Sequence, residues 1–564
     1  MPPLAKRRIV SAAVLLFFYL ALHSAVGDSP TMDEQNHIAR GLALLRTGDP
    51  RLSLEHPPLV NGLSALPLLT LPAIRLPTDH PSWERPEGWY EFAELLLWQY
   101  NRDATRMVFL GRLPVIFLTL GLALAGFGAA RRLFGLPAGV LALALLLFDP
   151  NLLAHGRYAT TDLGGALFAF LATLLLWRLW RRPDWAWSRW ALAGVGMGLA
   201  FGAKLSTLVF GPIWALLALL PLYPTAGRGG APRRLAQLLT AGLPALLLVW
   251  GLYAFEWRPF LFRSDLLAPL NGLAGPMPTF WAGIEQILLL SGGGRPAFLL
   301  GQFSDTGFAA YFPVAFAVKT PLLTLLLWPL TAVWLLRRQE TRKTAVFLLI
   351  PPLAYFLVSL QSALNIGYRH LLPMLPFVYV LVAGGVSGQV GKFANRFATR
   401  HSSLAPRHFL YALLLIPILT ALRIHPHYVS YFNLAAGGPA NGYRILVDSN
   451  VDWGQDLLRL QRWMAAEEVA HVNLAWFGTA DPAYYGLSYT PLPGLGRAEF
   501  FLRWWDVPFD RARPEPGVYA ISVTNLWELP LRAEEKTVFA WFRARAPDAR
   551  VGYSIHIYRV PPPP

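Results

Sequence analysis

Long apolar runs alternate with short basic segments along most of this sequence. Several runs approach the roughly 20 apolar residues that a helix needs to span about 30 Å of hydrocarbon. The composition agrees, because 54% of the residues are hydrophobic and only 15% are charged. We therefore expect a polytopic α-helical membrane protein of about 11 crossings. They lie near residues 9–27, 107–130, 138–153, 163–180, 190–203, 205–222, 235–255, 311–336, 344–360, 371–387 and 408–424.

The basic residues indicate how these helices are oriented. With the N-terminus inside, the inner segments carry twenty Lys and Arg side chains against two acidic ones, Asp184 and Glu340. Such an excess is typical of cytoplasmic segments. It accounts for the net charge of +16, so no nucleic-acid partner is needed. The first apolar run could be a cleaved signal peptide, but the many later crossings favour a retained helix.

This topology divides the chain into a membrane domain, residues 1–424, and an outer tail, residues 425–564. The membrane domain includes three outer loops, at 28–106, 154–162 and 256–310. The tail has helical stretches at 454–468 and 534–545. It also has strand-like runs at 444–447, 471–477, 518–523 and 553–560. We expect it to fold as a small extracytoplasmic α/β domain.

Acidic and histidine side chains gather in the first outer loop. Asp33 and His37 are four residues apart and share one face of any helix that starts there. Thr31 and Glu34 have the spacing of a capping box, which explains Glu34 as a helix start and leaves Asp33 unexplained.

Two further outer segments combine acidic and basic groups. Glu55 and His56 precede two prolines that favour an extended approach to the next helix, although a plain turn explains them equally well. Asp162 follows Arg157 in the short loop 154–162. Asp162 could simply cap the next helix, but a cap does not require the neighbouring arginine.

Cations also lie near the outer ends of the helices. They are Arg112, Lys319, Arg369 and His370, and lysine is rare in this chain. Snorkelling to the interface is the alternative for Arg112 and Lys319. Carboxylates and cations beside lipid suit a substrate with an anionic head and a lipid tail, since guanidinium groups bind phosphate and a carboxylate can accept a proton. These residues alone do not separate a transferase from a transporter or flippase of a lipid-linked anionic glycan.

Motifs spread over the chain resemble the GT-C glycosyltransferases, in particular bacterial relatives of the protein O-mannosyltransferases and aminoarabinose transferases. The motifs are Met-Asp-Glu at 32–34, Glu-His-Pro-Pro-Leu at 55–59, Gly-Arg-Leu-Pro at 111–114, Gly-Arg-Tyr-Ala-Thr-Thr-Asp at 156–162, the segments 311–321 and 367–373, and Asp-Ser-Asn-Val-Asp-Trp at 448–453. The resemblance implies transfer of a hexose or pentose from a polyprenyl-phosphate donor, with inversion. The acceptor would be a protein, lipid or glycan outside a bacterial cytoplasmic membrane.

The resemblance also implies residue roles. Asp33 would be the general base, Asp162 the second acidic residue of the site with Glu34 beside them, and Arg112 the arginine of the second membrane helix. We further infer that Arg157, Lys319 and Arg369, with His370, stabilise the departing lipid phosphate.

Two questions stay open at this point. Some relatives bind a divalent ion near the first-loop acids, and Asp33, Glu34, His37, Glu55 and His56 could supply ligands, but their spacing is not diagnostic and we expect no obligatory metal. In the tail, one loop lies between a predicted strand and a predicted helix. It is a possible acceptor-binding loop, because open α/β sheets tend to bind ligands at that position. Its residues are Asp448, Asn450, Asp452 and Trp453, and the alternative is a helix start with Asp452 and Gln455 as a capping box.

Overall fold

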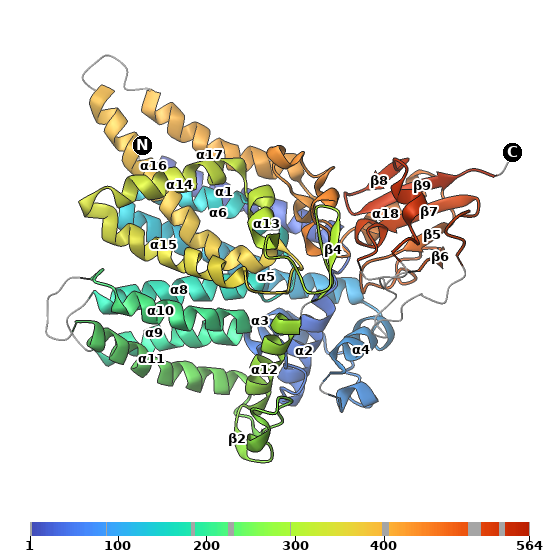
Figure 1. The fold of residues 1–564 in the computed structure, drawn as a ribbon, viewed down its shortest axis with the longest axis horizontal. Helices are drawn as coiled ribbons and strands as arrows, with labels where there is room; N and C mark the ends of the chain where they lie inside the picture. The colour runs from blue at the N-terminus through green and yellow to red at the C-terminus, as the bar shows by residue number, and fades with distance from the viewer. Residues whose placement is uncertain are drawn as a thin grey trace.

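The computed structural model describes residues 3–85, 87–181, 186–223, 230–293, 295–397, 405–493, 509–529 and 536–562. A bundle of long helices makes up most of the chain, and a five-stranded sheet near the C-terminus sits at one end of it (Figure 1). The bundle helices are α1 (Pro3–Gly27), α5 (Ala104–Phe134), α6 (Leu136–Phe148), α8 (Asp162–Trp180), α9 (Trp187–Ala203), α10 (Phe210–Leu219), α11 (Gly230–Leu252), α13 (Tyr311–Lys319), α14 (Leu322–Leu336), α15 (Gln339–Ser359), α16 (Leu375–Phe397) and α17 (Ala405–Ile424).

Within the described ranges, six helices are long and apolar enough to cross a membrane, or seven if the bent pair α13–α14 counts as one span. Most of the other bundle helices have fewer than 18 residues, so the number of eleven crossings stays a prediction. The helix α16 lies deepest: Phe377 to Ala383 are all buried, as expected of a helix that is apolar on every side.

Two expected crossings are interrupted. The stretch 311–336 is two helices, α13 and α14, which meet at an angle of 107°. One continuous helix does not form there because Pro321 has no N–H to donate and favours an extended Thr320, whose ψ is 135°. The stretch 138–153 is also two helices. Helix α6 ends at Phe148, and Asp149 then caps the short helix α7 (Pro150–His155).

Shorter elements cover the end of the bundle that faces the sheet. They are the helices α2 (Glu34–Thr47), α3 (Pro58–Ala65), α4 (Trp89–Glu94) and α12 (Pro278–Gly293), the 3-10 helix η6 (Tyr368–Met374), and two hairpins, β1 (Trp257–Pro259) with β2 (Ala274–Pro276) and β3 (Ala297–Leu299) with β4 (Gln302–Ser304). Except for η6, they lie in segments expected as outer loops. Of these, α2 and α3 pack against the bundle helices α5 and α9, whereas the β1–β2 hairpin projects from the bundle (Figure 1).

The C-terminal sheet has the strand order β6-β5-β7-β9-β8. Its strands are β5 (Val472–Ala475), β6 (Tyr489–Pro491), β7 (Gly517–Ser522), β8 (Ala549–Val551) and β9 (Ile555–Val560), with helices α18 (Leu457–Ala466), α19 (Val523–Leu526) and α20 (Ala540–Arg543). Strand β5 pairs in parallel with β6 and β7, and β9 pairs antiparallel with β7 and β8.

Three of the four strand-like runs of the tail lie in this sheet. The fourth, 444–447, is not a strand: a 3-10 turn, η9 (Gly442–Arg444), precedes it, and Val447 is buried against Phe298 and Leu529. Its apolar side chains fill a buried loop, which sequence periodicity alone does not distinguish from a short strand. The helix expected at 534–545 is only α20 within the part of the tail that the structure describes.

Candidate active site

Four side chains from distant parts of the sequence meet where the helical bundle adjoins the sheet. Arg369 Nη1, at the start of η6, lies 2.9 Å from Asp33 Oδ2 and 3.6 Å from Asp162 Oδ2. Lys204, between α9 and α10, forms an ion pair with the other oxygen of Asp162. We call Asp33, Asp162, Lys204 and Arg369 the carboxylate–cation cluster. Two acids and two cations alternate in it.

Local structure leaves the Asp33 carboxylate available. Asp33 precedes α2 at the N-cap position, but its side chain makes no capping hydrogen bond. Instead Glu34 turns back and accepts a hydrogen bond from the Thr31 backbone N–H at 2.8 Å. The Glu34 carboxylate therefore satisfies a backbone N–H ahead of the helix, and the side chain of Asp33 pairs with Arg369 in the cluster.

Lys204 reaches the cluster because α9 ends immediately before it. Its backbone is extended, with φ −159° and ψ 131°. Gly165 on α8 allows the close approach, since a Cβ at that position would lie 3.1 Å from the Cβ of Lys204. The sequence prediction did not include this lysine, although the rarity of lysine in the chain applied to it as much as to Lys319.

The tail loop 448–453 packs directly on the cluster. The Trp453 ring lies 4.4 Å from the Arg369 guanidinium carbon and contacts the ring of His155 at 5.6 Å. Asn450 ties the loop to η6, because its Oδ1 accepts a hydrogen bond from the Tyr368 N–H at 2.9 Å. The C-terminal tail and the helical bundle thus share one site.

Of the two acidic residues of this loop, Asp452 is buried and Asp448 is partly buried. Burial raises the pKa of Asp448 to about 7, while the nearby charge of Arg369 opposes the rise. Asp448 also has a left-handed backbone, with φ 56°, which is uncommon for a residue other than glycine. Burial likewise raises the pKa of Asp452 to about 7, and Asp452 accepts a 2.7 Å hydrogen bond from Ser522. Asp452 therefore holds the loop to α19 and the sheet.

Other predicted site residues are engaged in buried ion pairs. Arg112 binds both oxygens of Glu34, at 2.8 and 2.7 Å, and the backbone oxygens of Asp28 and Ser29. The Ala159 N–H also donates to Glu34 at 2.9 Å. These contacts connect the segment after α1, helix α5 and the loop before α8, and they engage the polar groups of Glu34 and Arg112 within the described part of the protein.

Arg157 is likewise engaged in a buried ion pair. It donates to Asp28 from Nε at 2.9 Å and from Nη2 at 2.8 Å, and Tyr158 donates to the same carboxylate oxygen at 2.7 Å. Arg459 of α18 pairs with the other oxygen of Asp28 at 2.6 Å. These cations and the Tyr158 hydrogen bond lower the pKa of Asp28 although burial would raise it. This network joins the membrane bundle to the C-terminal sheet region.

Lys319, expected as a phosphate ligand, is buried at the break between α13 and α14. Its ammonium donates to the backbone oxygen of Val429 at 2.7 Å and to that of Asn450. The Phe432 ring lies 4.8 Å from the same nitrogen. In this arrangement Lys319 fastens the tail loop to the helix break.

His370 lies beside the cluster, where the charges of Lys204, Arg369 and Asp162 act on it. Its Nε2 has no hydrogen-bond partner among the residues that the structure describes. The same holds for Arg369 Nε, so this end of the cluster keeps two unsatisfied nitrogens.

The possible metal ligands do not form one group. His37 Nδ1 is 2.9 Å from Asn61 Oδ1, its ring contacts His56 at 4.6 Å, and Glu55 pairs with Arg40 at 3.5 Å. Burial lowers the pKa of His37 to about 4 and holds that of His56 well below its usual value. Among the described residues, no three His, Asp or Glu side chains are arranged to hold a metal ion.

Comparison with known proteins gives one family match. Residues 107–250, from α5 to α11, match the family described as dolichyl-phosphate-mannose-protein mannosyltransferase. These helices resemble a glycosyltransferase family. The relationship to protein O-mannosyltransferases expected from the sequence is confirmed for this part of the chain. No curated protein matches the sequence.

Solved structures with similar helical arrangements are distant in sequence. ArnT from Cupriavidus metallidurans, bound to undecaprenyl phosphate, is 14% identical with a TM-score of 0.48, and the match covers 97% of each chain. The archaeal oligosaccharyltransferase AglB from Archaeoglobus fulgidus, in complex with an inhibitory peptide and a dolichol-phosphate, is 11% identical with a TM-score of 0.43. That match covers 74% of this chain and 55% of that chain.

Proposed function

We propose that this protein is an inverting glycosyltransferase that moves a sugar from a polyprenyl-phosphate donor to an acceptor on the outer side of the cytoplasmic membrane. The family match over the central helices supports the transferase class. The carboxylate–cation cluster supports the chemistry, because it combines a proton acceptor with cations suited to phosphate.

The accessibility of Asp33 carries the proposal. The Asp33 side chain is 19% exposed, whereas those of Asp162 and Glu34 are 1% and 0% exposed. Arg369 holds one carboxylate oxygen of Asp33 and orients it. Asp33 is therefore the acid of this group that an acceptor hydroxyl can reach, as a general base requires.

In the proposed reaction the acceptor oxygen attacks the anomeric carbon of the sugar while its proton passes to Asp33. The bond from the anomeric carbon to the phosphate oxygen breaks, and its electron pair stays on the lipid phosphate. Arg369, whose Nε has no partner among the described residues, and Lys204 are the cations closest to Asp33 and Asp162 and would stabilise that charge. Asp162, bound to both cations, would position them.

The charge distribution supports an outer location for this site. Asp162 begins α8, and Arg178 and Arg181 lie at its other end, 16 or more residues away in a 19-residue helix. A helix of that length spans about 28 Å, close to the thickness of the hydrocarbon core. Because basic residues favour the cytoplasmic side, we propose that the cluster and the tail 425–564 lie outside.

The ion pairs of the cluster also bear on whether the proposed reaction needs a metal ion. The two carboxylates of the cluster are already paired with Lys204 and Arg369, so cationic side chains occupy the positions that a divalent ion would take between them. We propose that no obligatory metal acts at this site.

The test is transfer by the purified protein in lipid vesicles with a panel of polyprenyl-phosphate sugars. Mass spectrometry follows donor loss and new glycosylated products from added peptides, lipids and glycans. We expect the wild type to consume one donor class and Asp33→Asn to lose at least a hundredfold in rate. Asp265→Asn is the matched control, because this exposed acid lies in another outer loop. Equal turnover in wild type and Asp33→Asn would contradict the proposed base.

Transport of a lipid-linked anionic glycan is the second candidate, favoured by the helix break between α13 and α14. Discontinuous helices are frequent at the binding sites of transporters. Here, however, the lysine at the break, Lys319, donates to backbone oxygens of the tail. Movement of a labelled donor across the vesicle membrane without any glycosylated product would favour transport over transfer.

A further inference from the structure

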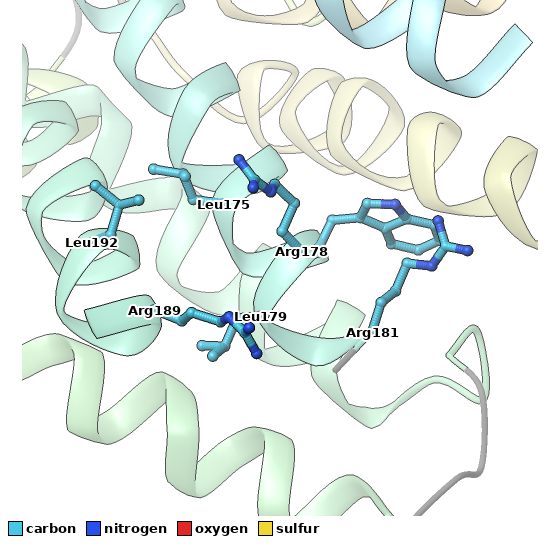
Figure 2. Close-up of a pocket in the computed structure, with 7 residues that line it drawn as sticks. Leu175, Arg178, Leu179, Arg181, Arg189 and Leu192 are labelled. Atoms are coloured by element: carbon cyan, nitrogen blue, oxygen red, sulfur yellow. The ribbon is translucent and has the colours of Figure 1, made fainter. Parts of the chain in front are cut away.

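A second basic site lies at the end of α8 that is remote from the carboxylate–cation cluster. Here α8 and the start of α9 form a groove (Figure 2). It is lined by Leu175, Trp177, Arg178, Leu179, Arg181, Arg189 and Leu192. We call it the arginine groove. The transfer reaction proposed above uses none of these side chains.

Polar groups of the groove are suited to an anion. Three of its lining residues are arginines and, among the described residues, no acidic side chain lines it. Figure 2 shows Arg178 on α8, Arg181 directly after the end of α8, and Arg189 on α9. Planar guanidinium groups bind phosphate oxygens through two parallel hydrogen bonds, so the groove favours a phosphate group.

Trp177 gives an independent observation at the same place. It is only 6% exposed, and its ring packs on Phe347 at 4.1 Å and on Tyr223 at 5.2 Å. Arg181 lies 5.4 Å from this ring. The indole Nε1 of Trp177 has no hydrogen-bond partner among the described residues. A buried donor of this kind is costly to leave unpaired, and Trp177 is one of the residues that line the groove.

The apolar wall of the groove identifies the class of anion. Leu175, Leu179 and Leu192 line it beside the arginines, and α8 is one of the helices long and apolar enough to span a membrane. A soluble phosphate would make no use of leucine side chains, whereas a phospholipid presents a phosphodiester next to acyl chains. Basic pockets between helices at the cytoplasmic side are suited to anionic lipid headgroups.

We propose that the arginine groove binds the headgroup of an anionic phospholipid, with Arg178 and Arg181 on the phosphodiester and the leucines against the first part of the acyl chains. The bound lipid would join α8 and α9 and, through Trp177, contact the side of α15 that carries Phe347. This site is separate from the donor site, so it does not depend on the proposed reaction.

Native mass spectrometry of the full-length protein in detergent tests this assignment. The protein is titrated with phosphatidylglycerol, with phosphatidylcholine of the same acyl chains, and with inorganic phosphate. We expect preferential retention of phosphatidylglycerol and a loss of affinity of about fivefold per arginine, or roughly twentyfold for Arg178→Gln with Arg181→Gln. The matched control changes Arg131 and Arg132 to Gln, since this exposed pair lies at the end of α5, outside the groove.

Trp177→Phe keeps an aromatic ring and removes only the N–H, so we expect a weaker loss, of a few fold. Unchanged phosphatidylglycerol binding by the double arginine variant, or an equal loss in the control pair, would overturn the proposal. Equal retention of phosphatidylcholine would show that the groove does not select charge and would also overturn it. Displacement of the lipid by inorganic phosphate would assign the site to a soluble phosphate instead.

Discussion

Asp33 and Glu34 are neighbours in the sequence, yet the structure uses them in different ways. Glu34 is fully buried, and its two oxygens accept hydrogen bonds from Arg112, Thr31 and Ala159. Asp33 is partly exposed and pairs with one cation, Arg369. A carboxylate whose lone pairs are all used holds a structure together, whereas one that keeps an accessible oxygen can take part in a reaction.

Arg112 and Arg369 differ in the same way. Arg112 donates from Nε, Nη1 and Nη2 to fixed acceptors of the protein. Arg369 pairs with Asp33 and Asp162 but keeps an Nε without a partner in the described part of the chain. The buried Glu34–Arg112 pair should therefore control stability, and the carboxylate–cation cluster should control activity.

Glu34→Gln gives the largest effect that this comparison predicts. It leaves the Arg112 charge buried without its counter-ion, and breaking a buried pair costs about 3–5 kcal/mol. We expect a large drop in the thermal unfolding midpoint of the detergent-solubilised protein, measured by tryptophan fluorescence. Asp33→Asn is the control and should unfold close to the wild-type temperature. Equal stability of Glu34→Gln and wild type would contradict the structural role of this pair.

Arg369→Gln should affect the reaction instead. Removing one donor to a developing negative charge costs about 10²- to 10³-fold in rate. We expect that loss in kcat for donor cleavage, normalised to folded protein, with Arg369→Lys retaining part of the activity because it keeps the charge. A rate that falls only in proportion to the amount of folded protein would place Arg369 with Arg112 as a structural residue.

The sequence predicted much of this arrangement because membrane helices carry strong signals. Apolar runs and flanking arginines located most bundle helices, and Asp33, Asp162 and Arg369, predicted from separate motifs, lie together in the structure. Asp33 stood out because a capping box already explained Glu34, and the structure shows one of the two hydrogen bonds of such a box, from the Thr31 N–H to the Glu34 carboxylate, although α2 begins at Glu34 with Asp33 as its N-cap. Local sequence patterns were informative where a structural role explained one residue, such as Glu34, and left its neighbour, Asp33, without such a role.

Long-range pairing was not predictable in the same way. Lys204 and Lys319 are both rare lysines within apolar runs, and only their partners separate them: Asp162 for Lys204, and two backbone oxygens for Lys319. Likewise Arg157 pairs with Asp28, 129 residues away. A single sequence contains no information on such pairs, since any buried arginine needs a partner but its identity depends on the packing of distant helices.

The pH dependence of stability tests whether folding raises the pKa of Asp448, the loop acid next to Arg369. Burial raises its pKa from 3.8 to about 7, so the folded state binds a proton more tightly than the unfolded state. This group's contribution to stability therefore falls as the pH rises from about 4 to about 7, by at most about 1.4 kcal/mol per pH unit. We expect Asp448→Asn to remove that slope in unfolding midpoints measured across the interval. Parallel pH profiles in wild type and variant would show that this carboxyl titrates normally.

Trp453→Phe should give a smaller change. The indole lies 4.4 Å from the Arg369 guanidinium, and such a contact contributes about 0.5–2 kcal/mol. Phenylalanine keeps an aromatic face but a weaker one, so we expect a loss of a few fold in kcat/KM for the donor. Trp98→Phe, in the segment between α1 and α5, controls for the general loss of an indole. If the two variants lose the same activity, the stacking on Arg369 has no specific part in the reaction.

Treatment with a chelator should have the smallest effect, because Lys204 and Arg369 already neutralise the two carboxylates of the cluster. We expect unchanged donor cleavage by the wild type after EDTA, measured with and without added Mg²⁺, Mn²⁺ or Zn²⁺.

Lys204→Met extends the test: with one cation removed, Asp162 could recruit a divalent ion, and added metal should then restore part of the lost rate. Loss of wild-type activity on chelation, recovered by one metal, would instead mean that Asp33 or Asp162 exchanges its cationic partner for an ion during the reaction. The cluster would then be the resting arrangement of a metal site, and Asp33 could act as its ligand rather than as a free base.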